Sequence, residues 1–301
     1  MPFVLFLVLL LTFPQPCGAE DVPYSAIVMG VKGKAVVQHN RNRKPADLGY
    51  LLYPGDEVTI TKSASLTINY LESGSEEQWP GGMKFVVGRT GSRPAISRVK
   101  KTARKIVLPQ IEYQQTGSIR LRGSGDPVRV SGLSNTCTIE ERPAFRWNPI
   151  AAADQYNVTL YREFKDEPSW RRTTKDTEMP YPENEPSLSL GTRYEWEIEA
   201  LENGTVIAAK HSCFYLPGRD ELDPMQERLK RYRAQLSNDP ADSASRLALI
   251  FFLEGHRLYD DAMEQYQALR GAHGKSESTG KREEILVDIR NSDCTHSWPR
   301  Q

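Results

Sequence analysis

The stretch Leu188-Ser189-Leu190-Gly191-Thr192-Arg193-Tyr194-Glu195-Trp196-Glu197-Ile198-Glu199-Ala200 decides the fold of the middle of this 301-residue chain. In its second half apolar and charged residues alternate, so that Tyr194, Trp196, Ile198 and Ala200 fall on every second position. Successive side chains of a strand point to opposite faces, and this period of two therefore predicts a strand with one buried face.

The residues around this stretch extend the same pattern. Upstream, residues 144–147 alternate and stop at Asn148-Pro149, and residues 155–161 place three apolar side chains on one face. Downstream, Asn203-Gly204 is a two-residue hairpin turn, and residues 213–216 supply a last strand. The region therefore consists of short antiparallel strands joined by turns.

Together these strands resemble a fibronectin type III domain, which we place at residues 136–216. The spacing of Leu188, Gly191 and Tyr194 has the layout of a tyrosine corner, in which the phenol closes a hydrogen bond across the end of the sandwich. The resemblance implies a spacer or a partner-binding surface.

Residues 24–88 also show short β-rich runs, separated by turn signals such as Pro54-Gly55-Asp56 and residues 72–75. Many short strands without helical periodicity predict a compact sandwich or barrel. The pair Glu76-Glu77 follows the second turn, where we expect solvated carboxylates.

The order of motifs in this first region resembles the periplasmic FecR-type domain, over residues 24–108. The motifs are Gly30-Val31, Leu51-Leu52, Pro54-Gly55-Asp56-Glu57-Val58, Ser65-Leu66-Thr67-Ile68, Gly74-Ser75 and Trp79. The resemblance implies a sensory or interaction domain. We expect residues 109–135 to link it to the sandwich.

Helical spacing replaces the period of two beyond the sandwich. Asp223-Pro224 has the form of a helix start, and apolar residues then recur three and four apart over residues 223–270. This part resembles one tetratricopeptide repeat, and a single repeat cannot bury its own face. We therefore expect these helices to pack on the sandwich, on a second copy of themselves or on a partner. The candidate partner-docking face is formed by Leu249, Leu253, Tyr259, Ala262 and Tyr266. Residues 271–301 are predicted to be a flexible tail, in which only residues 283–290 have the pattern of a short helix.

The first nineteen residues predict export. Residues 3–13 are almost wholly apolar, and a small-residue stretch follows up to Ala19. This layout is typical of a signal peptide cleaved after Ala19, and the run is too short for a membrane span. We expect an exported protein of the periplasm or cell envelope.

Export favours a disulfide. Without the leader, the remaining cysteines are Cys137, Cys213 and Cys294. Cys137 and Cys213 stand at the two ends of one sandwich, so we predict that they are bridged and that Cys294 is free. Two isolated buried thiols are the alternative. The five histidines are scattered singly, which argues against a metal site.

Charge is distributed unevenly in a chain whose 39 basic and 39 acidic residues balance. Residues 84–133 carry eleven basic and two acidic side chains. A solvated edge strand explains this stretch, because exposed Lys and Arg discourage pairing between strands. The competing explanation is an anion patch. Its candidate residues are Arg98, Lys100, Lys101, Arg104 and Lys105.

The prediction is a mainly β chain: a FecR-like β domain, a fibronectin type III-like sandwich and an α-helical C-terminal appendage. No nucleophile–base pair, phosphate loop or metal cluster is recognisable, so we predict neither catalytic residues nor a cofactor. The leading hypothesis is a non-enzymatic envelope protein that acts as a sensory or protein-interaction scaffold. The alternative is a binding protein for an anionic wall or outer-membrane polymer or a membrane surface, through residues 84–130. Nucleic acid is not an expected partner.

Overall fold

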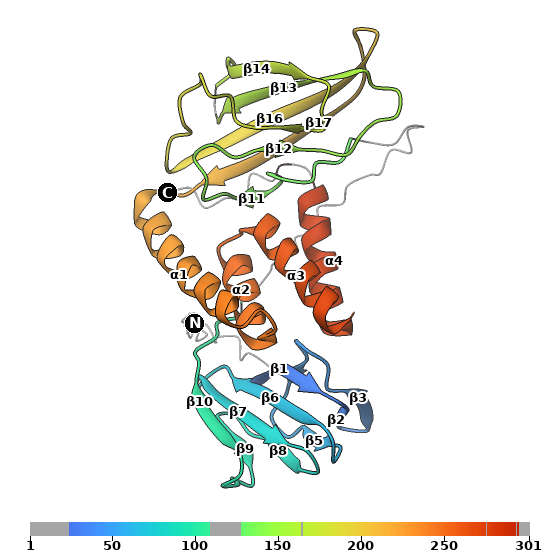
Figure 1. Ribbon diagram of the computed structural model, residues 1–301, viewed down its shortest axis with the longest axis vertical. Coiled ribbons are helices and arrows are strands. Elements are labelled where there is room, and N and C mark those ends of the chain that lie inside the picture. Colours follow the sequence, from blue (N-terminus) through green and yellow to red (C-terminus); the bar gives the residue numbers. More distant parts are fainter. Residues whose placement is uncertain (1–23, 109–127, 164, 275, 293, 295–301) are drawn as a thin grey trace, which may run out of the picture.

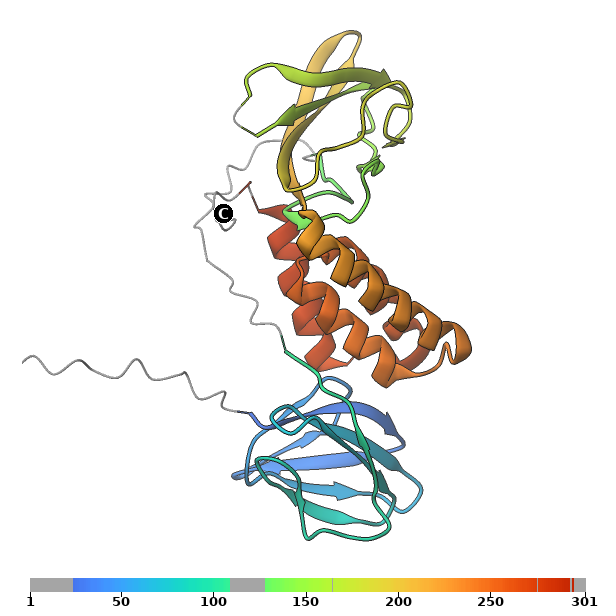
Figure 2. The same ribbon diagram turned by 90° about the vertical axis from the view of Figure 1, so that its left-hand side faces the viewer.

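The computed structural model describes residues 24–108, 128–163, 165–274, 276–292 and 294. Two β domains lie at the ends of the molecule, and four helices lie between them (Figure 1). The same order is visible after a quarter turn (Figure 2). The structure confirms a mainly β chain with a helical C-terminal part. The predicted leader, residues 1–19, lies outside the described residues.

The first β domain consists of ten strands in two five-stranded sheets. Sheet A has the order β10-β7-β6-β1-β4, and sheet B has the order β3-β2-β5-β8-β9. The strands are β1 (Ala26–Lys32), β2 (Ala35–His39), β3 (Asn42–Pro45), β4 (Leu51–Leu52), β5 (Glu57–Ile60), β6 (Ser65–Tyr70), β7 (Ser75–Pro80), β8 (Lys84–Val87), β9 (Ser92–Arg93) and β10 (Lys100–Ala103).

One apolar core lies between the two sheets, and the other face of β1 contributes to a second core, which it shares with the helices. Ala26 and Val28 point into the core between the sheets, where Trp79 stacks on Phe85 with ring centroids 4.1 Å apart. Ile27 and Met29 point the other way, into the core of the helices. The uninterrupted apolar run at the start of β1 is the sequence signal for a strand buried on both faces.

The second β domain has the predicted sandwich layout. Its large sheet has the order β11-β17-β16-β13-β14, and β12 pairs with β15. The strands are β11 (Thr136–Cys137), β12 (Phe145–Arg146), β13 (Gln155–Arg162), β14 (Pro168–Thr174), β15 (Glu178–Met179), β16 (Thr192–Glu202) and β17 (Thr205–Leu216). Phe145 from the small sheet meets Trp196 and Phe214 from the large one in the core.

Two local predictions in this domain are confirmed. Tyr194 Oη accepts a hydrogen bond from the Ser189 backbone N–H at 2.7 Å, which closes the tyrosine corner. Asn203 and Gly204 both have positive φ, as a two-residue hairpin turn between β16 and β17 requires. The predicted boundary needs correction, because Val130 already pairs with Trp147 and residues 128–135 belong to the sandwich rather than to a linker.

Four helices follow: α1 (Arg219–Asn238), α2 (Ser243–Gly255), α3 (Tyr259–His273) and α4 (Glu277–Asn291). Each packs on the next in chain order. α1 begins before the predicted start and includes Pro224. The Asp242 carboxylate caps α2 by accepting from the Ser245 N–H at 3.0 Å.

The fourth helix contradicts the predicted flexible tail. Arg282 of α4 forms an ion pair with Glu254 of α2, whose side chain is fully buried, and Tyr266 Oη of α3 donates to the same carboxylate at 2.7 Å. The Arg282 guanidinium also lies over the ring of Phe251, 5.2 Å from its centroid. This charged, Gly-containing segment thus forms a helix that packs on α2 and α3, because its Arg282 pairs with the buried Glu254 carboxylate.

Candidate functional sites at the two domain junctions

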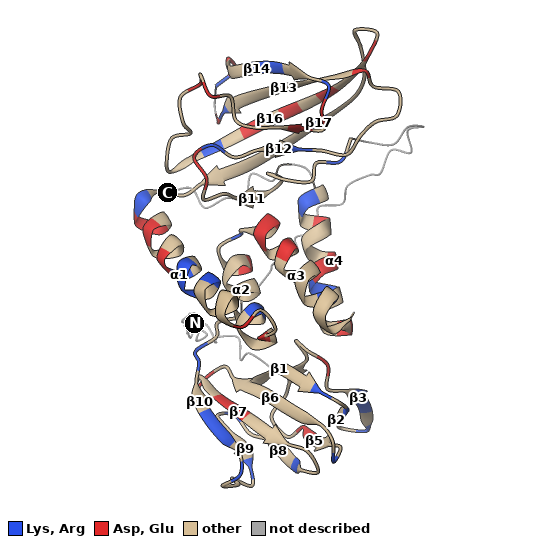
Figure 3. Cartoon of the chain, viewed as in Figure 1, with Lys and Arg blue, Asp and Glu red and all other residues tan. Residues whose placement is uncertain are grey.

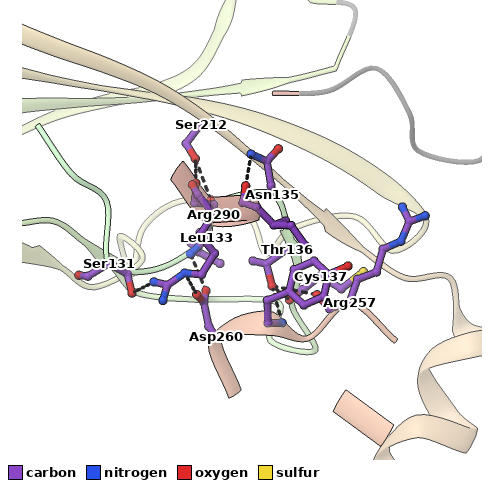
Figure 4. Close-up of polar contacts among 12 residues, drawn as sticks. Ser131, Leu133, Asn135, Thr136, Cys137, Ser212, Arg257, Asp260 and Arg290 are labelled. Carbon is purple, nitrogen blue, oxygen red and sulfur yellow. Dashed lines mark hydrogen bonds and ion pairs between the residues drawn. The ribbon is translucent and has the colours of Figure 1, made fainter. Parts of the chain in front are cut away.

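The sandwich supplies the cap that α3 lacks. Leu258 precedes α3 and makes no side-chain cap, but Thr136 of β11 accepts from the Tyr259 backbone N–H through Oγ1 at 3.0 Å. The same hydroxyl donates to the carbonyl of Arg257 at 2.9 Å, and the Cys137 N–H donates to that carbonyl at 2.8 Å. The helix start is therefore formed jointly by two domains (Figure 4).

The other end of this junction caps α4. The carboxamide of Asn135 donates through Nδ2 to the carbonyls of Ile289 and Ser292, at 3.1 and 2.8 Å, and Ser134 Oγ donates to that of Arg290. The last carbonyls of a helix have no partner within it, so these bonds satisfy them. One short segment of the sandwich thus holds the start of α3 and the end of α4.

An ion pair lies between these two caps. Arg290 Nε is 3.0 Å from Asp260 Oδ1, while Asp260 Oδ2 accepts from the Leu133 N–H at 2.7 Å. Arg290 also donates to the Ser131 carbonyl. Burial raises the pKa of Asp260, and Arg290 and the Leu133 N–H partly offset this effect. Burial, with Glu264 and Asp260 nearby, raises the pKa of Asp261 to about 6.

A disulfide closes the same junction, and it is not the predicted one. Cys213 of β17 is bonded to Cys294, just beyond α4, and Cys137 is free and buried. The prediction of a Cys137–Cys213 bridge was wrong because it treated residues 271–301 as a flexible tail. β11 runs parallel to β17 with Cys137 opposite Tyr215, while α4 carries Cys294 to the sheet. Burial raises the pKa of the Cys137 thiol to about 12, which keeps it protonated.

The first junction, between sheet A and the helices, is mainly apolar. Ile27 and Met29 of β1 share a core with α2 and α3. Polar contacts flank this core: Ser243 Oγ donates to the Met29 carbonyl at 3.3 Å, and Ser276 Oγ donates to the Leu48 carbonyl at 2.7 Å. Arg104 donates to Ser245 Oγ at 3.2 Å and lies 4.0 Å from the Asp242 carboxylate. A pocket of about 110 Å³ lies beside these contacts. Small-molecule sites usually measure roughly 300–1,000 Å³, so this pocket suits a few waters only.

The candidate anion patch is divided by the structure. β10 is an edge strand of sheet A, as the edge-strand explanation requires. Lys101 Nζ lies 2.8 Å from Glu77, and Arg104 Nε lies 3.2 Å from Glu76. Arg98, Lys100 and Lys105 are exposed and form no ion pair with the described residues. Three of the five candidate charges are therefore exposed and unpaired within the described residues.

The glutamates in this arrangement correct the expectation of a solvated turn. Glu76 and Glu77 lie in β7 and are 4% and 0% exposed. Burial alone would raise the pKa of Glu77, but Lys101, the Ser92 N–H and the Trp79 indole N–H outweigh it and lower that pKa. The two carboxylates hold the edge strand in place.

The predicted docking face is buried within the chain. Its residues Leu249, Leu253, Tyr259, Ala262 and Tyr266 are at most 8% exposed. They share one core with side chains of α1, α4 and β1. The prediction of an open face was wrong because it counted neither α4 nor the sheet A face as cover.

The junction residues Thr136, Asp260 and Arg290 were missed by sequence reasoning. Thr136 and Asp260 are ordinary polar residues in the sequence, and only the predicted short helix ending at Arg290 pointed to this region. Within the described residues, no group of His, Cys, Asp and Glu could hold a metal ion. No helix in the described part of the chain has the length and apolar character needed to cross a membrane.

Comparison with known proteins adds little beyond this geometry. No protein-family model matches the chain, and no curated protein is similar to it. Among solved structures, the fibronectin type III domain of the human collagen alpha-1(XX) chain is 19% identical, with a TM-score of 0.25, over 32% of this chain and 92% of that one. The chicken CNTN1 FN1-FN3 domains are 10% identical, with a TM-score of 0.22, over 64% of this chain; the match spans about half (54%) of their own length.

Proposed function

We propose that this protein is a non-enzymatic scaffold of the cell envelope, which holds two β domains at a set distance and orientation so that partner proteins bind to both. One observation carries the proposal. Ile27 and Met29 of the first domain and Cys137 of the second belong to the same apolar core as the four helices. A linker that shares its core with both neighbouring domains fixes their relative distance and orientation, whereas a flexible linker does not.

The assignment to the envelope rests on the leader-like residues 1–19 and on the disulfide between Cys213 and Cys294, which suits an oxidising compartment. The FecR-like interpretation of residues 24–108 belongs to the same proposal. Its support is the order of the motifs and the two-sheet domain they form. Sensing would then be a role of the first domain, and spacing and binding would be roles of the second.

Site-specific photo-cross-linking tests the scaffold function with the full chain. A photoreactive residue replaces Gln78 in the first domain or Tyr161 in the second, and the control position is Lys281 on the helices. In envelope extract we expect defined proteins to be cross-linked from both β domains and to co-purify as one complex. Cross-links from one domain only would overturn the proposal, since a second aligned domain would then have no use.

A further inference from the structure

We propose that the outer face of sheet B binds a linear acidic polysaccharide. The inference does not depend on the scaffold function. Sheet A is covered by the helices on its outer side, because Ile27 and Met29 point into their core. No described element packs on the outer side of sheet B, whose residues there, such as Thr59 and Lys84, are exposed.

The first β domain is strongly positive, well beyond the basic stretch noticed in the sequence. Residues 24–108 contain fourteen basic and six acidic side chains. Thirteen of the basic residues are exposed, whereas three of the acidic ones, Asp56, Glu76 and Glu77, are buried. Residues 128–216 of the second domain contain ten basic and fourteen acidic side chains, so the positive surface belongs to one domain (Figure 3).

Strand register places arginines at both ends of one row across sheet B. The row runs Arg43, Gln38, Glu57, Val86, Arg93, from β3 at one edge to β9 at the other. Four strand spacings separate the two arginines, a span of about 19 Å. Lys84 stands beside the row, next to Thr59 and 2.7 Å from Glu57.

This arrangement suits a chain rather than a small ion. Arg43 and Arg93 form no ion pair with the described residues and are too far apart to share one carboxylate. A linear polymer can engage both, and each guanidinium can bind a carboxylate through two hydrogen bonds. Gln38 and Thr59 between them offer hydrogen-bonding groups to sugar hydroxyls.

A polymer also fits better than a bilayer. Basic residues occupy both edges of the domain, on β3 and on β10 (Figure 3). The β10 edge belongs to sheet A, so a flat bilayer cannot use the charge of both edges at once, whereas a linear chain along the row needs only Arg43 and Arg93 of sheet B. Val86, 36% exposed, is the only apolar side chain of the row, whereas helices that lie in a membrane interface bury a whole apolar face in lipid.

The test measures binding of the full chain to polygalacturonate, with dextran as the uncharged comparison. The variant Arg43→Gln/Arg93→Gln should weaken binding about tenfold and flatten its salt dependence. The matched control Arg98→Gln/Lys100→Gln removes the same charge from the β10 side and should change binding less than about threefold. Equal losses in both variants would overturn the proposal, because binding would then follow net charge alone.

A second pair of variants tests for a change of binding affinity in the opposite direction. Glu57→Gln removes the acidic residue at the centre of the row and should strengthen binding about threefold, whereas Glu72→Gln, on the turn before β7, should have little effect. A gain that is the same for both, or no saturable binding to polygalacturonate, would contradict the proposal. So would tighter binding to vesicles containing phosphatidylglycerol than to the polymer.

Discussion

At the first junction β1 meets the helices mainly through Ile27 and Met29. At the second junction the segment 131–137 caps α3 and α4 and bonds to both members of the Asp260–Arg290 ion pair, and the Cys213–Cys294 disulfide joins β17 to the residue beyond α4. Apolar contact is non-directional and depends on packing. Hydrogen bonds and ion pairs are directional and respond to protonation. The same helices are therefore held by two mechanisms that fail under different conditions.

Loss of the disulfide should have the largest effect, and it should be confined to the second junction. The bond joins residues 81 apart, so Cys294→Ser should lower the free energy of unfolding by about 2–4 kcal/mol. Denaturant unfolding measures the cost, and hydrogen exchange should increase in residues 131–137 and at the end of α4. The control is Cys137→Ala, which removes a thiol that forms no disulfide. Equal stability of oxidised wild type and Cys294→Ser would contradict the prediction.

The apolar junction can be weakened by removing one side chain. Met29 is fully buried, and Met29→Ala should cost about 2–4 kcal/mol through lost burial and a cavity. Val206→Ala, at an exposed site on β17, should change the free energy of unfolding by less than about 0.5 kcal/mol. Hydrogen exchange should increase at β1 and α2 and stay unchanged at β11. If hydrogen exchange increases equally at β1 and at β11, the two junctions are not held in different ways.

The polar junction should respond to pH through Asp261. Its folded pKa of about 6 exceeds the unfolded value near 4, so the folded state binds the proton more tightly and stability falls as pH rises from about 4 to 6. Arg233 opposes this shift, while Glu264, Asp260 and Glu140 add to it. Asp261→Asn should therefore stabilise by about 1–2 kcal/mol at pH 7 and by much less at pH 4. Thermal unfolding across this range checks the sign; an equal gain at both pH values would count against it.

The smallest expected effect separates the sandwich from its junction. Tyr194→Phe removes the hydrogen bond from the Ser189 N–H and should cost about 1 kcal/mol. Hydrogen exchange should change around residues 188–194 but not at Thr136 or Asp260. Tyr161→Phe, on a half-buried side chain of β13, is the control. If hydrogen exchange also changes in α3, the tyrosine corner and the second junction are energetically coupled.

Local patterns predicted most of the β structure. The alternation at Tyr194, Trp196 and Ile198 and the Asn203-Gly204 turn each depend on neighbouring residues only, and the structure confirms them. Burial of Glu77 could not be predicted in this way, because its partner Lys101 is 24 residues away in the chain. The two residues meet only when β10 pairs with β7. A carboxylate next to a turn gives no local sign of such a partner.

The junctions were beyond sequence reasoning for the same reason. Ser276 bonds to the Leu48 carbonyl across 228 residues, and Thr136 caps α3 across 123. The segment containing Gly280 looks like a linker until Glu254 is buried opposite Arg282. Cysteine pairing depended on that helix, since α4 places Cys294 beside β17.

The helices lie between the β domains in the molecule but follow both of them in the sequence. A ribosome therefore completes both β domains before it makes the part that joins them, and a chain that threads through a membrane from its N-terminus delivers them in the same order. The contacts of longest sequence separation, which form slowly, are the ones that set the distance between the domains. A prematurely ended chain would carry both β domains with no means of aligning them.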